Sequence, residues 1–278
     1  MTLSPATLQL LAHLPAVCNM VRRVAVEAGD LTLMYFDEDG FVADIKADGS
    51  PVTSADREAE ALIIRGLNAF APDVPVVGEE SVAAGNIPDL AGHDYFWLVD
   101  PLDGTKEFIK GSGDYTVNIA LIHKGVPVLG VIYAPVPGEL YSGCGEGTAL
   151  RYMAESGSEK KIFVRDMPVE GLTVITSRGH NNQQKIEEFL AGFKVAKVLH
   201  RGSSLKMCMI AAGKGDIYPR PGETCEWDTA AGDAILRSAG GKIVDFDGNV
   251  LSYGHAEKKF LNPEFVASSG FWPIPDSD

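Results

Sequence analysis

The chain has 278 residues, of which 45% are hydrophobic, and its formal net charge at pH 7 is −14. This length and composition predict a globular protein with a sizeable core, as one large domain or two smaller ones. The acidic charge and the lack of a basic stripe exclude a nucleic-acid-binding protein and disfavour anionic membranes as partners.

The cysteines and the N-terminal segment indicate where the protein works. Four cysteines are widely spaced and form no CxxC pair, so a reducing compartment is expected; they are Cys18, Cys144, Cys208 and Cys225. No apolar run approaches the roughly 20 residues that span a bilayer. The basic residues near the N-terminus follow its apolar stretch, which is unlike a signal peptide. We therefore expect a cytoplasmic protein without a membrane span.

The first 110 residues predict helices that alternate with extended segments. Ser4 and Pro5 have the character of an N-cap and a first helical residue, and a second helix follows Pro15. An extended piece up to Thr53 precedes a third helix. The short strands "VPVV" and "YFWLVD" come next, and each runs directly into an acidic segment.

The remaining chain first predicts consecutive strands and then an alternation. "YTVNIALI" and "VPVLGVIYA" read as an antiparallel hairpin, "LYSGCGEGTALR" continues the meander, and "MAESGSEKK" is expected to be a surface loop. From "LTVITS" onwards, strands and helices alternate, which is typical of an α/β layer. The prediction is therefore an α+β domain over 1–160 and an α/β domain over 161–278.

Acidic residues gather at four of the predicted strand ends and helix starts. They are Asp56, the pair Glu79 and Glu80, the pair Asp100 and Asp103, and Asp228. Each has an ordinary structural interpretation: "DPLDG" is a common turn composition, the two single aspartates suit N-caps, and the glutamates suit a solvated loop. Taken together, they predict one shared site if these ends converge.

Several carboxylates in one pocket cannot all ionise without a compensating charge. The natural partner is Mg²⁺, which prefers oxygen ligands and bridges carboxylates to phosphates, whereas zinc would require histidine or cysteine. Pro101 cannot continue a strand ladder, so the turn is expected to aim Asp100 and Asp103 at two cations about 4 Å apart. Gly104 allows close backbone approach, and amides near it, or at a helix starting at Asp228, suit phosphate oxygens.

Three motifs occur in order along the chain: "GEES", "DPLDGT" and "WDTAAG". Together they resemble the signature of the lithium-sensitive, magnesium-dependent phosphatases, the inositol monophosphatase superfamily. The resemblance extends from about Val17 to Ser268. It implies a layered α/β/α/β/α sandwich, in agreement with the two segments described above.

Other residues are similar to the CysQ branch, the 3′(2′),5′-bisphosphate nucleotidases. The matching stretches are "DPLDGTKEFI" followed by "YTVNIALI", and later "GSSLKMC", "YPR" and "EWDTAAG". Inositol monophosphatases typically have Thr-Asn-Phe where this chain has Lys106, Glu107 and Phe108. The chain departs from the branch at Gly222-Glu223-Thr224, where Gly-Pro-Thr is usual, and this concerns the rim that binds the base.

The resemblance implies roles for individual residues. One Mg²⁺ is held by Glu79, Asp100 and the carbonyl of Leu102, a second by Asp100, Asp103 and Asp228, and a third, weaker one by Glu79 and water. Thr105 and Asp56 form a pair that positions and deprotonates the attacking water, with Glu79 as the third catalytic residue. The predicted substrate-binding residues are Glu79, Leu102, Asp103, Gly104, Thr105, Ser203, Lys206, Arg220 and Asp228.

The implied activity is hydrolysis of the 3′-phosphate of adenosine 3′,5′-bisphosphate to AMP and phosphate, in sulfur metabolism and with inhibition by Li⁺. Phosphoadenylyl sulfate is a candidate second substrate. An inositol phosphate or a sugar phosphate is the close alternative substrate, and a catalytically silent nucleotide or metal sensor is the alternative of another class.

Two of the predicted substrate-binding residues also have an ordinary structural interpretation. For Lys206 it is a solvated surface lysine, and for Arg220 it is a structural ion pair.

Overall fold

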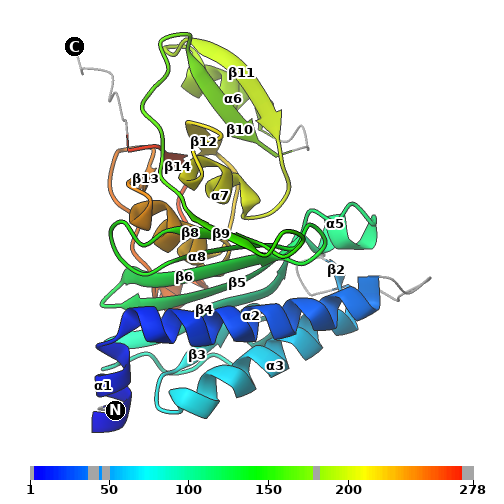
Figure 1. The fold of residues 1–278 in the computed structure, drawn as a ribbon, viewed down its shortest axis with the longest axis vertical. Helices are drawn as coiled ribbons and strands as arrows, with labels where there is room; N and C mark the ends of the chain where they lie inside the picture. The colour runs from blue at the N-terminus through cyan, green and yellow to red at the C-terminus, as the bar shows by residue number, and fades with distance from the viewer. Residues whose placement is uncertain (1–2, 37–43, 46–50, 178–181, 271–278) are drawn as a thin grey trace.

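The computed structural model of the protein describes residues 3–36, 44–45, 51–177 and 182–270. Five layers are stacked in the order helix, sheet, helix, sheet, helix (Figure 1). The paired helices α2 (Leu14–Phe36) and α3 (Ser54–Phe70) form the first layer, and a seven-stranded sheet the second. Helices α7 (Leu205–Ala211) and α8 (Glu226–Ser238) lie between this sheet and a five-stranded one, which carries α6 (Gln183–Leu190) outside. The predicted fold class and sandwich are confirmed.

The N-terminal helices begin where the capping residues predict. Helix α1 spans Pro5–Leu11, with Pro5 in its first turn, and the Ser4 hydroxyl accepts a hydrogen bond from the Thr7 amide at 3.2 Å. Helix α2 has Pro15 in its first turn, where a missing amide hydrogen costs nothing. Its residues at helical spacing, among them Val17 and Val21, are fully buried against the first sheet.

The first sheet has the strand order β3-β4-β5-β6-β7-β8-β9, with β3 and β4 parallel and all other neighbours antiparallel. Its strands are β3 (Val76–Gly78), β4 (Tyr95–Asp103), β5 (Thr116–His123), β6 (Val126–Ala134), β7 (Glu139–Gly143), β8 (Leu150–Met153) and β9 (Ser158–Lys161). The short helices α4 (Glu79–Ala83) and α5 (Thr105–Ile109) follow β3 and β4, and β1 (Asp44–Ile45) pairs with β2 (Pro51–Val52).

One predicted loop is a strand. The segment "MAESGSEKK" was expected to be a surface loop, but it turns at Gly157, with φ +61°, and continues as β9 antiparallel to β8. The strand lies at the edge of the sheet and its side chains are mostly exposed. Its polar composition therefore carries no burial signal, which explains why the pattern did not indicate a strand.

The second sheet has the strand order β11-β10-β12-β14-β13. Strand β10 (Leu172–Thr176) is parallel to β11 (Val195–His200) and β12 (Ile217–Arg220), while β14 (Phe265–Ser268) is antiparallel to β12 and β13 (Lys242–Asp245). A 3₁₀ turn, η1 (Ala256–Lys258), precedes β14. The predicted strand and helix alternation is thus present, with antiparallel pairing added at the end of the chain.

Helix α8 joins the two sheets. It comes from the C-terminal segment, yet it packs across β4, β5 and β6 on the face opposite α2 and α3. At the closest approach, a Cβ on Gly130 would lie 2.3 Å from the Ala231 carbonyl oxygen, so only glycine fits in β6 there. One core cluster contains residues of both segments, including Leu98 and Ile235.

The domain division at residue 160 stays a prediction. None of the helices in the described ranges is long and apolar enough to cross a membrane.

Candidate active site

A β-bulge brings two of the predicted metal ligands to one face of the first sheet. Asp100 lies opposite Asn118 and Asp103 opposite Thr116, so the two residues between the aspartates face only Val117. In a regular strand, residues three apart point to opposite faces, but one extra residue corrects this. The strand was expected to end at Asp100. It instead continues to Asp103, because the bulge accommodates Pro101.

Asp100 lies at the centre of the carboxylate group. It is 1% exposed, and its Oδ1 accepts a hydrogen bond from the Leu102 amide at 2.9 Å. Burial raises the pKa of Asp100 well above its ordinary value, and the charges of Glu79, Asp103 and Asp228 raise it further. The four predicted metal-binding carboxylates are therefore close enough to oppose one another's ionisation.

Asp56 and Asp228 occupy the same position in two different helices. They were expected as possible N-caps, but each is the third helical residue of a capping box, because α8 starts at Glu226. Asp56 Oδ2 accepts from the Thr53 amide at 2.7 Å, and Asp228 Oδ2 accepts from the Cys225 amide at 2.8 Å. Burial, followed by the charges of Asp103 and Glu79, raises the pKa of Asp228 to about 8.

Thr105 and Asp56 form the contact that the resemblance implies. The Thr105 hydroxyl lies 3.2 Å from Asp56 Oδ1 and 3.3 Å from the Leu102 carbonyl oxygen, so its one hydrogen can serve either acceptor. Gly104, just before it, has φ +99°, a conformation that favours glycine, and a Cβ there would lie 3.1 Å from the Asp114 carbonyl oxygen.

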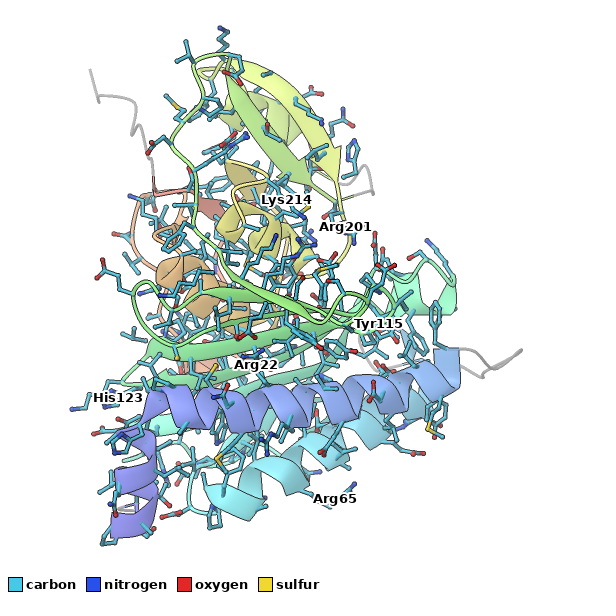
Figure 2. The ribbon with its side chains drawn as sticks, viewed as in Figure 1. Arg22, Arg65, Tyr115, His123, Arg201 and Lys214 are labelled. Carbon is cyan, nitrogen blue, oxygen red and sulfur yellow. The ribbon has the colours of Figure 1, made fainter. Side chains whose placement is uncertain are left out.

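Aromatic packing supports the segment that contains Gly104 and Thr105. The Phe108 and Tyr115 rings meet edge to face at 4.9 Å between centroids, and Leu102 packs in the same buried cluster. The Tyr115 hydroxyl lies 3.1 Å from the Thr32 hydroxyl of α2, which joins the loop to the first layer. Figure 2 shows Tyr115 at the end of the first sheet that carries α5.

Glu79 and Glu80 begin helix α4, where a solvated loop was the ordinary alternative. The buried side chain of Glu60 on α3 holds this start. Its carboxylate accepts hydrogen bonds from the Glu80 amide at 2.7 Å, the Ser81 amide at 2.8 Å and the Ser81 hydroxyl at 2.5 Å. No sequence motif marked Glu60, because its partners lie 20 and 21 positions away.

The Asp103 carboxylate is held by Ser204. Asp103 Oδ2 accepts from the Ser204 amide at 2.6 Å and from its hydroxyl at 2.7 Å. Sequence reasoning selected Ser203 and missed Ser204, although both lie in "GSSLKMC". Across the described ranges, no three His, Cys, Asp or Glu side chains are arranged so that together they could hold a metal ion. Glu79, Asp103 and Asp228 lie close enough to Asp100 for their charges to raise its pKa, but the ligand set itself stays a prediction.

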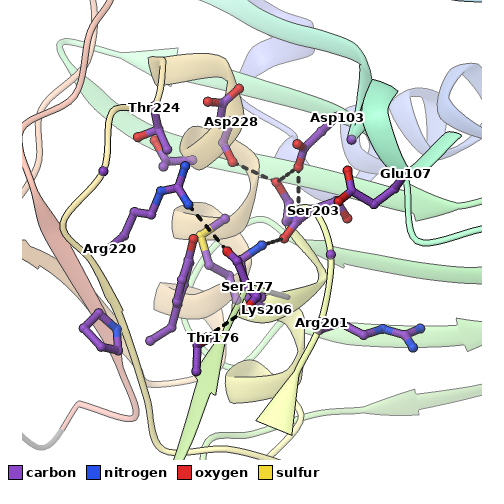
Figure 3. Close-up of a pocket in the computed structure, with 18 of the residues that line it drawn as sticks. Asp103, Glu107, Thr176, Ser177, Arg201, Ser203, Lys206, Arg220, Thr224 and Asp228 are labelled. Carbon is purple, nitrogen blue, oxygen red and sulfur yellow. Dashed lines mark hydrogen bonds between the residues drawn. The ribbon is translucent and has the colours of Figure 1, made fainter. Parts of the chain in front are cut away.

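A cavity of about 860 Å³ opens beside Asp103 and Asp228. Figure 3 shows these two residues on one side of the pocket and Lys206 and Arg220 nearer the other. The lining includes four of the predicted substrate-binding residues besides the two aspartates, namely Gly104, Ser203, Lys206 and Arg220. Lys106 and Arg201 add further positive charge to the wall. Such a volume is within the usual range for small-molecule sites.

Lys206 is buried, so the solvated-surface interpretation is wrong for it. The side chain is 6% exposed, its amine donates to the Ser203 carbonyl, and it lies 5.2 Å from the centre of the Tyr218 ring. Burial lowers the pKa of Lys206 to about 8, although Asp103 acts to raise it. Ser203 has φ +49°, which places its carbonyl toward this amine at a cost of about 1 kcal/mol.

Arg220 contacts neutral oxygens. Its guanidinium donates to the Ser177 hydroxyl at 3.5 Å and to the Glu223 carbonyl at 3.1 Å. The ordinary interpretation was a structural ion pair, but within the described ranges its hydrogen bonds go to a hydroxyl and a carbonyl, and its charge acts to lower the pKa of Asp228. Glu223 is exposed on the rim, where it contributes its backbone rather than its carboxylate. His180, which received no role, lies outside the described residues.

The fold agrees with three comparisons with known proteins. The 3'(2'),5'-bisphosphate nucleotidase CysQ of Escherichia coli (strain K12) is 43% identical over 256 residues, which cover 92% of this chain and 99% of that protein. The crystal structure of CysQ from Bacteroides thetaiotaomicron matches with a TM-score of 0.78 and 34% identity, covering 92% of this chain and 98% of that one.

An inositol monophosphatase from Anabaena (Nostoc) sp. PCC 7120 has a TM-score of 0.72 and 25% identity, and the match covers 93% of this chain and 92% of that one. The model of the Inositol monophosphatase family matches residues 15–273, a range that includes both sheets and every predicted site residue. The chain therefore belongs to the Inositol monophosphatase family.

Proposed function

We propose that the protein is a Mg²⁺-dependent phosphomonoesterase that removes the 3′-phosphate of adenosine 3′,5′-bisphosphate. Water supplies the oxygen that phosphorus gains, the P–O bond to the ribose 3′-oxygen breaks, and that oxygen takes up a proton. The products are AMP and inorganic phosphate. The similarity to bisphosphate nucleotidases of the CysQ type supports this substrate over other phosphate esters.

One observation carries the proposal: the pocket has two kinds of wall. The half-buried carboxylates Asp103 and Asp228, whose negative charges help to raise the pKa of the buried Asp100, line one side, and Lys206 and Arg220 lie nearer the other. A substrate with two phosphates needs both, because the scissile phosphate goes to the carboxylate side with cations, and the second phosphate needs positive side chains. An ester with one phosphate would leave the second wall unpaired.

The donor set fits Mg²⁺. The ligands would be Asp100, Asp103, Asp228, Glu79 and the Leu102 carbonyl, all of them oxygen donors, and the family uses this ion. Burial and the neighbouring carboxylates raise the pKa of Asp100 and of Asp228, and a bound cation would relieve this repulsion. When bound, Mg²⁺ supplies the positive charge that lets a phosphate enter an acidic site and that favours in-line displacement. We propose two to three ions.

The protein's own residues position the reactants. Thr105 donates to Asp56, whose other oxygen is held by the Thr53 amide, so the pair is oriented to accept a proton from the attacking water. Ser203, Lys206 and Arg220 would hold the 5′-phosphate and nucleoside from the second wall. The bulge at Pro101 keeps both aspartates of β4 on the same face of the sheet, where they would face the scissile phosphate.

The test is a panel of phosphate esters assayed with Mg²⁺. The panel contains adenosine 3′,5′-bisphosphate, phosphoadenylyl sulfate, inositol 1-phosphate, fructose 1,6-bisphosphate and AMP. We expect the highest kcat/KM for the first, with AMP as the product. Asp100→Asn should lower kcat/KM by at least about 100-fold, because a carboxylate between two cations is lost.

Three outcomes would contradict the proposal in different ways. The highest kcat/KM for inositol 1-phosphate would leave the chemistry intact but remove the nucleotide assignment. No phosphate release from any ester, together with tight Mg²⁺ binding, would indicate a silent sensor. An Asp100→Asn protein with near wild-type activity would remove the metal-site assignment.

A further inference from the structure

Ser204 and Asn118 form a chain of hydrogen bonds that ends on Asp103. The Asn118 amide nitrogen on β5 donates to the Ser204 hydroxyl at 3.0 Å. That hydroxyl lies 2.7 Å from Asp103 Oδ2 and 2.8 Å from the backbone carbonyl oxygen of Asp228. Figure 3 draws the bonds that join Asp103 and Asp228 through this point as dashed lines. One hydroxyl thus contacts residues of β4, β5 and α8.

The direction of these bonds follows from the single hydroxyl hydrogen. Asn118 donates to Ser204, so the serine oxygen uses a lone pair there and has one hydrogen to give. An ionised carboxylate is a stronger acceptor than an amide carbonyl, so the hydrogen goes to Asp103. The Ser204 amide reaches the same Oδ2 at 2.6 Å. Asp103 Oδ1 makes no hydrogen bond within the described part of the chain, and it remains for a cation.

The side chain of Ser204 does not cap the helix that it precedes. It is the N-cap residue of α7, where a serine side chain normally accepts a hydrogen bond from the first helical turn. Here the side chain makes no capping bond, which costs the helix about 1 kcal/mol. The preceding Ser203 also has the left-handed φ of +49°. Helix stability therefore does not explain the orientation of Ser204.

Asn118 is likewise placed at a cost to folding. It is 1% exposed, and among the described residues nothing donates a hydrogen bond to its Oδ1. A buried amide oxygen without a donor costs about 1–3 kcal/mol. Directly paired residues of neighbouring strands share a face, so Asn118 lies on the same side of the sheet as Asp100. A residue selected for stability alone would be apolar there.

We infer that Ser204, supported by Asn118, is a positioning residue that fixes the Asp103 carboxylate for cation binding. The inference rests on the proposed function, and it adds residues that act through Asp103 without touching the substrate's reacting atoms. Neighbours that orient metal ligands typically change metal affinity by about 10–100-fold when they are replaced. Replacing Ser204 or Asn118 should change the affinity for the cation, because the ligand Asp103 itself is retained.

The experiment measures cation binding directly. Mg²⁺ is titrated calorimetrically into the full-length protein, and kcat is then determined as a function of Mg²⁺ concentration. Ser204→Ala should weaken Mg²⁺ binding by about 10-fold, and kcat at saturating Mg²⁺ should return to within about 3-fold of the wild-type value. Ser204→Thr keeps the hydroxyl and should restore the affinity. Asn118→Ala should weaken binding less, since Ser204 retains its hydrogen.

Ser268→Ala is the matched control. Ser268 is also a serine that is 1% exposed, and its hydroxyl has no hydrogen-bond partner in the described ranges. Its replacement should leave Mg²⁺ affinity unchanged. Wild-type affinity in both Ser204→Ala and Asn118→Ala would overturn the inference, as would an equal loss in the Ser268 variant. If Ser204→Ala does not fold, Asn118→Ala and Ser204→Thr decide. Wild-type protein that binds no Mg²⁺ would overturn the proposed function itself.

Discussion

Lys206 keeps its amino group in a buried position beside a carboxylate, an aromatic ring and a backbone carbonyl. The carbonyl accepts a hydrogen bond from the amine, and the Tyr218 ring and the Asp103 carboxylate favour its protonated form. Burial has a larger effect than the charge of Asp103 and lowers the pKa of Lys206 to about 8. The charged form is therefore present below that pH and is lost above it. Because a phosphate dianion favours the charged amine, substrate binding should be coupled to this proton.

This coupling predicts a pH-dependent KM. In the wild-type protein, KM for adenosine 3′,5′-bisphosphate should rise by about 10-fold per pH unit above the pKa of Lys206, while kcat changes little. Lys206→Arg carries a guanidinium that stays charged, so its KM should be flat over the same range. Steady-state kinetics between pH 7 and 9.5 provide the measurement. A flat wild-type KM, or the same rise in Lys206→Arg, would contradict this role.

Element boundaries at the site depend on side chains of other elements. The start of α4, which carries Glu79, is held by Glu60 from the second turn of α3 through two amides and one hydroxyl. Gly78 leaves room for this contact, since a Cβ there would lie 2.5 Å from the Glu60 carboxylate. Glu60 is thus expected to set both local stability and the position of Glu79.

Replacing Glu60 by glutamine tests this arrangement. The variant turns one acceptor oxygen into a donor group that faces an amide or a hydroxyl, so unfolding should become easier by about 2 kcal/mol. The melting temperature should fall by about 4 °C or more, and kcat/KM should fall as well. Glu58→Gln is the control, because Glu58 is exposed on the same helix. Its hydrogen bond from the Tyr35 hydroxyl can be accepted by the glutamine oxygen as well, so its effect should stay within about 0.5 kcal/mol. Equal effects in the two variants would argue against the role of Glu60.

Periodicity and capping residues were sufficient to predict most elements of this fold. They failed at β9, which is polar and exposed, and at the end of β4, where the register with β5 determines that the strand continues through a proline. The acidic cluster was predictable because its residues follow strands or open helices. Ser204, Asn118 and Glu60 were not, because their contacts join residues between 20 and 101 positions apart in the sequence. Such pairs become visible only when the sheet and helix packing is known.

The carboxylates of the site come from both segments of the molecule. Glu79, Asp100 and Asp103 belong to the first sheet and its connections, and Asp228 belongs to α8. Burial raises the pKa of Asp100 and of Asp228, the latter to about 8, so the fold without metal favours their protonated forms. In the unfolded chain both ionise near pH 4. Their contribution to stability is therefore full below pH 4 and is lost as pH rises toward 8.

This predicts opposite effects of pH with and without Mg²⁺. In EDTA, the melting temperature should fall between pH 5.5 and 8, and it should fall less in Asp228→Asn, which has no proton to lose. The cation binds the ionised carboxylates, so the increase in melting temperature on adding Mg²⁺ should grow over the same range. Thermal unfolding at several pH values measures both. An increase of the same size at pH 5.5 and pH 8 would be evidence against these carboxylates as the ligands.

The packing of α8 on the first sheet also has a consequence for synthesis on the ribosome. Strands β3 to β9 have all been synthesised once Lys161 is made, but the helix that covers one face ends roughly 80 residues later, at Ser238. At about 5–20 residues per second, this face stays open for roughly 4–16 s. The nascent chain therefore carries an uncovered apolar surface, including Leu98 and Ile132, for that time. Chaperone capture during translation should be concentrated in this interval.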